Sequence, residues 1–191
     1  MRIENFELLS TLLKQRSGLV LTKDKAYLLE TRLMPVARKY NLANLDQICD
    51  AVRTRQDSAM IADITDVMMS CGTHFFRDKK PFDLFSTKVL PRLRAARADT
   101  KKIRLWCAAC SSGQEPYSLA MLIKEAQETL GGWQIEILAT DLSEGILAKA
   151  KAGIYSQFEV QRGLPIRMLI KYFRQNGDKW HMDSGIRSMV D

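Results

Sequence analysis

The residues most able to do chemistry in this sequence lie between Ile103 and Glu115, where an apolar segment leads into very small residues. Alternation of apolar side chains predicts a strand over residues 103–107. Pro116 favours the start of a helix directly afterwards. In open α/β sheets ligands bind beside such a strand-to-helix turn. The small residues that would let a ligand approach the backbone are Ala108, Ala109, Ser111, Ser112 and Gly113.

A carboxylate follows the next predicted strand. The strand covers residues 135–140 and Asp141 comes directly after it. That position suits a carboxylate that accepts hydrogen bonds from a ribose diol. A hydrogen bond to a charged acceptor contributes about 1.5–3 kcal/mol, which is enough to orient a nucleoside. The turn and Asp141 together predict a nucleoside-containing ligand.

The turn does not suit a pyrophosphate. A G-x-G-x-x-G fingerprint is absent, and Gly113 is the single glycine of the turn. Glu115 places a carboxylate near the helix start, where a phosphate would otherwise sit. The pattern therefore favours S-adenosylmethionine, with its cationic sulfur and ammonium group, over NAD. The alternative is a generic turn in which Glu115 serves only the helix end.

The elements around the turn alternate strand, helix, strand and helix, which predicts a parallel α/β sheet. Gly131-Gly132 should end the first helix, Ser143 should cap the second, and Gly153 should end it. After Gly153 we expect a loop over 158–165 and a helix over 166–170. A β-hairpin over 171–182 should follow, with a type I′ turn at Asn176-Gly177, and then an extended run over 186–190.

Two parallel strands and a hairpin do not complete a doubly wound sheet. We therefore expect a fragment, or a sheet completed by a swapped second copy.

The part ahead of the sheet is predicted to be helical, with short helices over residues 1–55, including a third helix over 45–54, and another over 58–70. In the second helix Thr22 is the expected N-cap, and Pro35 should kink or split it. Asn44-x-x-Gln47 indicates a capping box. The sequence thus divides into a helical domain at 1–78, a basic connector helix at 79–102 and a partial α/β domain at 103–191.

Basic residues gather in two places. Lys25, Arg32 and Lys39 form a row beside the apolar face of the second helix, either as a docking surface for an acidic helix or as a solvated edge. Between Lys88 and Arg104 there are seven basic residues and one acid. The net charge of +7 implies an acidic partner. Nucleic acid is the weaker choice, because no interleaved aromatic residues or recognition motif accompany the charge.

Other features suggest a soluble cytoplasmic protein. We see no apolar run of membrane-spanning length and no signal peptide. Cys107-x-x-Cys110 has redox or zinc spacing, but no second ligand pair matches it. We interpret the cysteines as reduced, small apolar residues. Residues 70–77 predict a loop anchored by Phe75 and Phe76, with Arg77 at its tip.

Four ordered motifs resemble the chemotaxis receptor methyltransferases, the CheR family. Residues 106–120, WCAACSSGQEPYSLA, look like the cofactor motif of that family. Thr73–Arg77 is similar to its Asn-Glu-Thr-x-Phe-Phe-Arg loop, and Ala139–Ser143 to its second-strand motif. Ala150, Gly153 and Tyr155 follow with the same spacing. The resemblance covers almost the whole chain.

This resemblance implies a small helical domain followed by a Rossmann-like class I methyltransferase domain. It implies transfer of a methyl group from S-adenosylmethionine to glutamates on the cytoplasmic methylation helices of chemoreceptors, with S-adenosylhomocysteine as product. Arg77 would be catalytic, and the cofactor contacts would be Thr73, Arg77, Ala109, Glu115 and Asp141. Lys25, Arg32 and Lys39 would dock the receptor. The alternative is a truncated, non-catalytic module that binds cofactor or receptor.

The sequence departs from the family pattern in two ways. Cys71 and Gly72 replace the asparagine and glutamate of the loop motif, which removes one expected contact and loosens the loop. We find no counterpart for the later asparagine-containing cofactor motifs, the catalytic-side tyrosine, or the inserted β-subdomain that binds receptor tails. The chain therefore resembles an N-terminal portion of the family.

Overall fold

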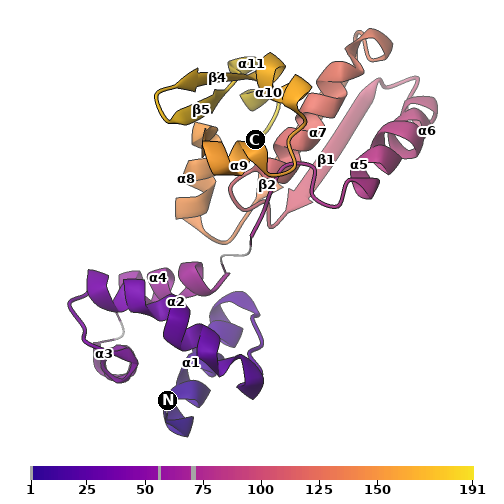
Figure 1. The fold of residues 1–191 in the computed structure, drawn as a ribbon. Coiled ribbons are helices and arrows are strands. Elements are labelled where there is room, and N and C mark those ends of the chain that lie inside the picture. The colour runs from indigo at the N-terminus through magenta and orange to yellow at the C-terminus, as the bar shows by residue number, and fades with distance from the viewer. Residues whose placement is uncertain (1, 56, 70–71) are drawn as a thin grey trace. The chain divides into compact units, whose positions relative to one another are not determined.

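The computed structural model describes residues 2–55, 57–69 and 72–191. The chain forms two compact units, Met1–Cys71 and Gly72–Asp191 (Figure 1). The division lies ahead of the boundary near residue 78 that the sequence suggested. The predicted basic connector is helical and belongs to the second unit, as α5 (Lys80–Leu84), a π-helical segment (Phe85–Val89) and α6 (Leu90–Ala96). None of the described helices is both long enough and apolar enough to cross a membrane.

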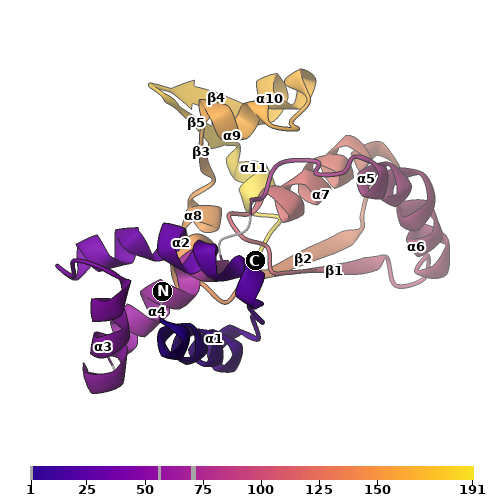
Figure 2. The same ribbon diagram turned by 60° about the horizontal axis from the view of Figure 1, so that its bottom comes forward.

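The first unit is all-helical, as predicted (Figure 2). It consists of α1 (Ile3–Ser17), a 3-10 turn (Lys23–Lys25), α2 (Ala26–Lys39), α3 (Leu45–Arg55) and α4 (Ser58–Met69). Apolar residues at helical spacing meet in one core because each helix turns one stripe inward. Its fully buried members include Leu9, Leu13, Leu29, Leu33, Ile48 and Ile64.

One local expectation for the first unit was wrong. Thr22 precedes the 3-10 turn without a side-chain capping hydrogen bond. Pro35 lies inside α2 and does not split it. The expected box at α3 is only half formed. Asn44 Oδ1 accepts from the Gln47 amide at 3.0 Å, but the Gln47 side chain accepts from the Ala43 amide at 2.8 Å.

The second unit contains the predicted parallel pair. β1 (Lys102–Ala108) lies beside β2 (Gln134–Thr140), with Ile103 opposite Ile135 and Ala108 opposite Thr140. The inward face buries Ile103, Cys107 and Ile137, and α7 (Gln114–Glu125) contributes Ala120, Met121 and Ile123 to the same core. The side chain of Ser143 accepts from the Ile146 amide and begins α8 (Glu144–Ala152), which Gly153 ends, as predicted.

The chain returns to the parallel sheet at its last described residues. Val190 bridges Ile137 in parallel, the Asp191 amide donates to the Ile137 carbonyl at 2.9 Å, and the Ala139 amide donates to the Asp191 carbonyl at 2.7 Å. The predicted extended run over 186–190 was wrong in its first part. Ser184–Arg187 is a short helix, α11, because the Asp183 carboxylate accepts from the Gly185 amide at its start.

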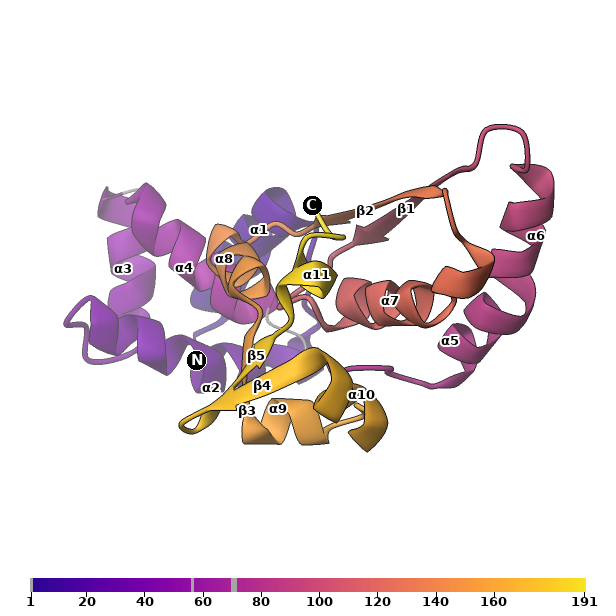
Figure 3. The same cartoon turned by 90° about the horizontal axis from the view of Figure 1, so that it is seen from above.

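The part of the chain between α8 and α11 forms a second, antiparallel sheet, which lies to one side of both helices (Figure 3). Its strand order is β3 (Ile154–Ser156), β5 (Lys179–Met182), β4 (Phe173–Asn176). Two short helices, α9 (Gln157–Gln161) and α10 (Ile166–Tyr172), connect β3 to β4. We call this sheet the small sheet. It contradicts the expectation that the chain lacks an inserted β-subdomain.

The small sheet corrects two further predictions. The expected loop over 158–165 contains much of α9, because Ser156 and Glu159 form a reciprocal capping box. The hairpin is confirmed, but its two turn residues are Gly177 and Asp178, since Asn176 pairs with Lys179. Of these two turn residues Gly177 alone has positive φ, 60°, which is the type II′ rather than the type I′ pattern.

The carboxylate of Glu125 joins α7 to α10, the second of the two helices that connect β3 to β4. Glu125 Oε1 accepts from the Tyr172 hydroxyl at 2.5 Å and from Lys171 Nζ at 2.6 Å. Arg167 Nη2 lies 3.4 Å from the other oxygen. The hydrogen bonds from Lys171 and then Tyr172 hold the pKa of Glu125 below its usual value. The ionised carboxylate therefore stabilises the contact between α7 and α10.

We expect Glu125→Gln to lower the free energy of unfolding by about 1 kcal/mol near neutral pH, because the charge-assisted hydrogen bonds weaken. The folded-state pKa of Glu125 is lowered, so its contribution is complete above its ordinary value of 4.5 and is lost as pH falls through the folded-state pKa. Urea denaturation at several pH values measures this. The difference from the native chain should shrink on acidification. Glu128→Gln is the control, since that exposed carboxylate has no ion pair in the described chain. A pH-independent difference would contradict the account.

Candidate functional site

The turn after β1 has an unusual backbone. Ala109 has a φ of 57°, Ser111 of 51° and Gly113 of 91°, so the left-handed region recurs at every second residue. Non-glycine residues in this region cost about 1–3 kcal/mol each and persist only where the surroundings fix them. Such residues cluster at ligand sites. We call residues 108–114 the cofactor turn, after the role predicted for them.

Neighbouring elements hold the cofactor turn through hydrogen bonds. The Cys110 amide donates to the Thr140 carbonyl at 2.9 Å, and the Ser111 amide donates to Asp141 Oδ2 at 2.8 Å. Asp141 Oδ1 accepts from the Ser143 amide at 3.2 Å. The carboxylate of Asp141 therefore joins the turn to the start of α8. Asp141 follows the end of β2, as predicted. Its carboxylate accepts hydrogen bonds from two protein amides, in addition to any role toward a ligand.

Gly113 is required by both conformation and packing. A Cβ there would lie 2.9 Å from the Tyr117 ring and 3.1 Å from the Ala150 Cβ. The Tyr117 hydroxyl donates to the Ala150 carbonyl at 2.8 Å, which draws α7 and α8 together around this glycine. The close approach places the N-terminus of α7 beside the turn.

Ala108, Ala109 and Glu115 are the exposed residues of this region. Glu115 lies in the first turn of α7, and its carboxylate has no hydrogen bond or ion pair within the described residues. Burial first, and the charge of Glu115 second, raise the pKa of the Cys107 thiol to about 12. A negative charge at this helix N-terminus suits a cationic or neutral ligand better than a phosphate.

The Thr73–Arg77 loop is anchored as predicted. The buried Phe75 ring packs edge-on against Tyr155 at 5.1 Å between centroids and against Phe173 at 5.7 Å. The Phe76 amide donates to Ser118 Oγ at 3.0 Å, which fixes the loop to α7. The Phe76 ring packs on Phe82 at 5.3 Å. Thr73 is partly buried in this loop.

Arg77 folds back on its own loop. Its Nη1 donates to the Gly72 carbonyl at 2.9 Å, and its Nε lies 3.9 Å from Asp78 Oδ2. The side chain is 58% exposed, so most of the guanidinium faces solvent. The departure at Cys71 lies outside the described residues. Gly72 is exposed and supplies the carbonyl that holds Arg77.

The predicted docking row lies in the first unit. Lys25 is exposed at the end of the 3-10 turn. Arg32 Nη1 donates to the Met68 carbonyl at 3.0 Å, and Lys39 Nζ pairs with Asp63 at 2.6 Å. Two of the three basic residues therefore also fasten α2 to α4.

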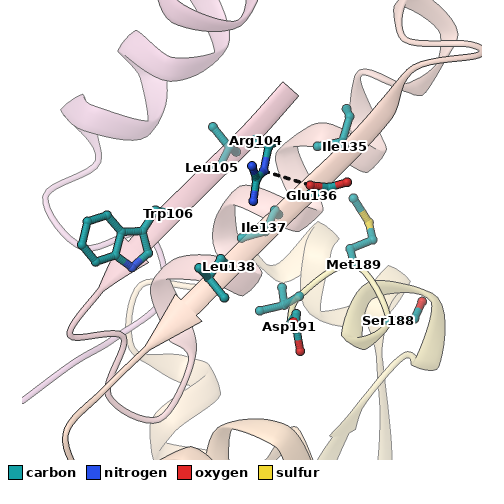
Figure 4. Close-up of a pocket in the computed structure, with 11 residues that line it drawn as sticks. Arg104, Leu105, Trp106, Ile135, Glu136, Ile137, Leu138, Ser188, Met189 and Asp191 are labelled. Carbon is teal, nitrogen blue, oxygen red and sulfur yellow. Dashed lines mark ion pairs between the residues drawn. The ribbon is translucent and has the colours of Figure 1, made fainter. Parts of the chain in front are cut away.

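A hollow of about 660 Å³ lies on the uncovered face of the parallel sheet (Figure 4). Arg104, Trp106 and Leu138 line it, and Arg104 Nε pairs with Glu136 at 3.0 Å. Trp106 is 70% exposed. This hollow is an open sheet face and does not coincide with the cofactor turn, none of whose residues lines it.

The cysteines in the described part of the chain are free and buried, which confirms that they pack as small apolar residues. Sequence reasoning gave no role to three side chains of this region. Ser118 fixes the Thr73–Arg77 loop, Tyr155 holds the turn, and Tyr117 joins α7 to α8. Tyr117 and Ser118 lie inside the motif over residues 106–120, and Tyr155 follows Gly153 at the family spacing, but neither signal gave these side chains a role.

Comparison with known proteins identifies two family models. Residues 72–191 match the CheR methyltransferase SAM binding domain, and residues 4–68 match the CheR methyltransferase all-alpha domain. Chemotaxis protein methyltransferase 1 of Pseudomonas aeruginosa is 38% identical over 98% of this chain and 69% of the relative. Chemotaxis protein methyltransferase of Vibrio parahaemolyticus is 38% identical over 88% of this chain and 61% of the relative. That of Escherichia coli is 30% identical over 88% and 56%.

Gly113→Ala should destabilise the second unit by about 3 kcal/mol, because the added methyl group clashes with Tyr117 and Ala150 in addition to the backbone strain. Gly132→Ala is the matched control. Gly132 also has positive φ, 75°, but no atom lies within 4 Å of its ideal Cβ, so about 1 kcal/mol is expected. Urea denaturation followed by tyrosine and tryptophan fluorescence measures both. Equal losses for the two variants would show that Gly113 is needed for backbone conformation alone.

Proposed function

The chain belongs to the CheR methyltransferases, and from that premise we propose that it methylates glutamate side chains of chemoreceptors in the cytoplasm, forming methyl esters. Its cofactor is S-adenosylmethionine. The observation that carries the proposal is the strained cofactor turn, held to Asp141 at the end of β2 and followed by the exposed carboxylate of Glu115.

The donors and acceptors of the turn fit this cofactor. Asp141 retains lone pairs on both oxygens, which suits a ribose diol, beside the two protein amides that it already accepts. The unpaired carboxylate of Glu115 suits an ammonium group. Small side chains at Ala108 and Ala109 leave the backbone accessible. When bound, the cofactor supplies a methyl group on a cationic sulfur.

The acceptor needs orientation more than activation. A glutamate side chain has a reference pKa of about 4.3 and is already ionised at neutral pH, so no general base is required. A carboxylate oxygen approaching a cationic centre neutralises charge. The protein's contribution is then to align the carboxylate and exclude water. We assign the alignment to Arg77, whose planar guanidinium can bind a carboxylate through two parallel hydrogen bonds.

Receptor docking is assigned to the basic row formed by Lys25 of the 3-10 turn together with Arg32 and Lys39 of α2. Lys25, Arg32 and Lys39 lie seven residues apart and present positive charge toward an acidic helix. Lys25 is the exposed end of the row, while Arg32 and Lys39 also bond to α4. Electrostatic attraction of this kind speeds encounter and weakens as salt is added.

Methyl transfer to an acidic receptor fragment tests the proposal. With S-adenosylmethionine carrying a labelled methyl group, we expect label in the fragment that base releases as methanol, as an ester requires. Arg77→Ala should lower the rate by about 100-fold, because misplacing the acceptor costs that much. Arg92→Ala is the control, an exposed arginine on α6.

Near-normal turnover of Arg77→Ala would remove Arg77 from the site. Absence of base-labile label with the native chain would contradict the proposed reaction. Cofactor binding without transfer would then favour the non-catalytic module.

A further inference from the structure

Tyr155 is the point where three parts of the second unit meet. It is the central residue of β3 and is 0% exposed. Its ring packs edge-on against Phe75 of the Thr73–Arg77 loop, with 5.1 Å between centroids and 72° between the rings. It packs in the same way against Phe173 of β4, at 6.2 Å and 68°. The loop and the small sheet therefore share one aromatic cluster.

The hydroxyl of Tyr155 leaves this cluster and reaches the cofactor turn. It donates to the Ser112 carbonyl at 2.8 Å. Ser112 lies between Ser111 and Gly113, both in the left-handed region. The other hydrogen bonds that the structure gives the turn come from the turn itself, from β2 and the residue after it, and from α7. Tyr155 is thus the turn's hydrogen-bonded link to the small sheet within the described residues.

We propose that Tyr155 is a positioning residue for the cofactor: its hydroxyl holds Ser112 so that the turn keeps the shape that receives the nucleoside, while its ring seats the loop that carries Arg77. The proposal rests on the cofactor site described above. Tyr155 acts through Ser112 and Phe75, and it is not a catalytic residue.

The physical basis is the strain in the turn. Left-handed conformations at Ala109 and Ser111 persist because surrounding bonds fix them, so each bond that is removed widens the range of turn conformations. Loss of the hydroxyl also leaves the Ser112 carbonyl without this donor in a buried place. Burial raises the pKa of Tyr155 far above its usual value, so the hydroxyl stays protonated and keeps donating.

The same geometry couples the small sheet to the cofactor. Tyr155 pairs with Trp180 of β5, and its ring contacts Phe173 of β4. A displacement of these strands would move the hydroxyl that holds Ser112. Cofactor affinity should therefore respond to changes in the small sheet through this one side chain.

Tyr155→Phe is the decisive variant because it keeps the ring contacts and removes only the hydroxyl. Tyr117→Phe is a matched control. Its buried hydroxyl also donates to a backbone carbonyl at 2.8 Å, but that carbonyl belongs to Ala150 of α8 rather than to the turn. Thermal unfolding first establishes that both variants fold and lose similar stability.

Calorimetric titration with S-adenosylhomocysteine then separates the two variants. We expect Tyr155→Phe to weaken binding by about three- to tenfold, the effect of one buried hydrogen bond, and Tyr117→Phe to leave it within about twofold. Unchanged affinity of Tyr155→Phe would overturn the proposal. Equal losses in both variants would also overturn it, since they would reflect general destabilisation.

A ligand-free measurement separates this proposal from the cofactor assignment. Amide hydrogen exchange of Ser111–Gly113 should be faster in Tyr155→Phe than in the native chain, and unchanged in Tyr117→Phe. Absence of binding by the native chain would reject the cofactor site and with it any effect of Tyr155 on affinity. Amide hydrogen exchange at the turn would still show whether the Tyr155 hydroxyl holds Ser112 in place. Equal exchange rates in the native chain and both variants would reject this role of Tyr155 as well.

Discussion

The second unit depends on one constraint, the left-handed backbone of the cofactor turn. Ala109 and Ser111 adopt left-handed conformations that non-glycine residues keep only where their surroundings fix them, and Gly113 completes the series. They are fixed because Thr140 and Asp141 hold the turn from β2 and Tyr155 holds it from β3. Hydrogen bonds from these neighbouring strands therefore offset the backbone strain of the turn. The strands themselves are held by contacts with residues far away in the sequence. A backbone fixed in this way exposes amides and carbonyls to a ligand in one arrangement.

The small sheet is therefore part of the site's support. Phe173 and Tyr155 come from the sheet, and they enclose Phe75 of the Thr73–Arg77 loop. Gly163, between α9 and α10, also lies against this loop, since a Cβ there would fall 2.0 Å from the Phe75 carbonyl. Glu125 fastens α10 to α7, the helix that begins at the turn. The loop that carries Arg77 and the turn that would bind the cofactor thus share one set of supports.

Local sequence signals predicted the parts of this arrangement that depend on local physics. Alternating apolar residues gave β1 and β2, and the Ser143 cap and Gly153 stop gave α8, because each depends on neighbours within a few residues. The failures depend on distant contacts. Ile154 pairs with His181, so β3 has no local signal, and the turn at Gly177 is set by the register of β4 and β5. The hydrogen bond from Tyr155 to Ser112 and those from the Ser111 and Ser143 amides to Asp141 could not be predicted in the same way. The bonds from Tyr155 and Ser111 join residues that are far apart in the sequence. The roles of Thr73, Arg77, Ala109, Glu115 and Asp141 toward a ligand stay predictions.

The most direct test of the central claim is where S-adenosylhomocysteine binds on the 191-residue chain. Backbone amide resonances recorded by heteronuclear NMR during a titration report this residue by residue. The account predicts that the largest shifts fall on the amides of Ala109–Gln114 and on Asp141, with smaller shifts in the Thr73–Arg77 loop. Shifts confined to the open sheet face around Trp106 and Leu138, or no shifts at millimolar ligand, would contradict it.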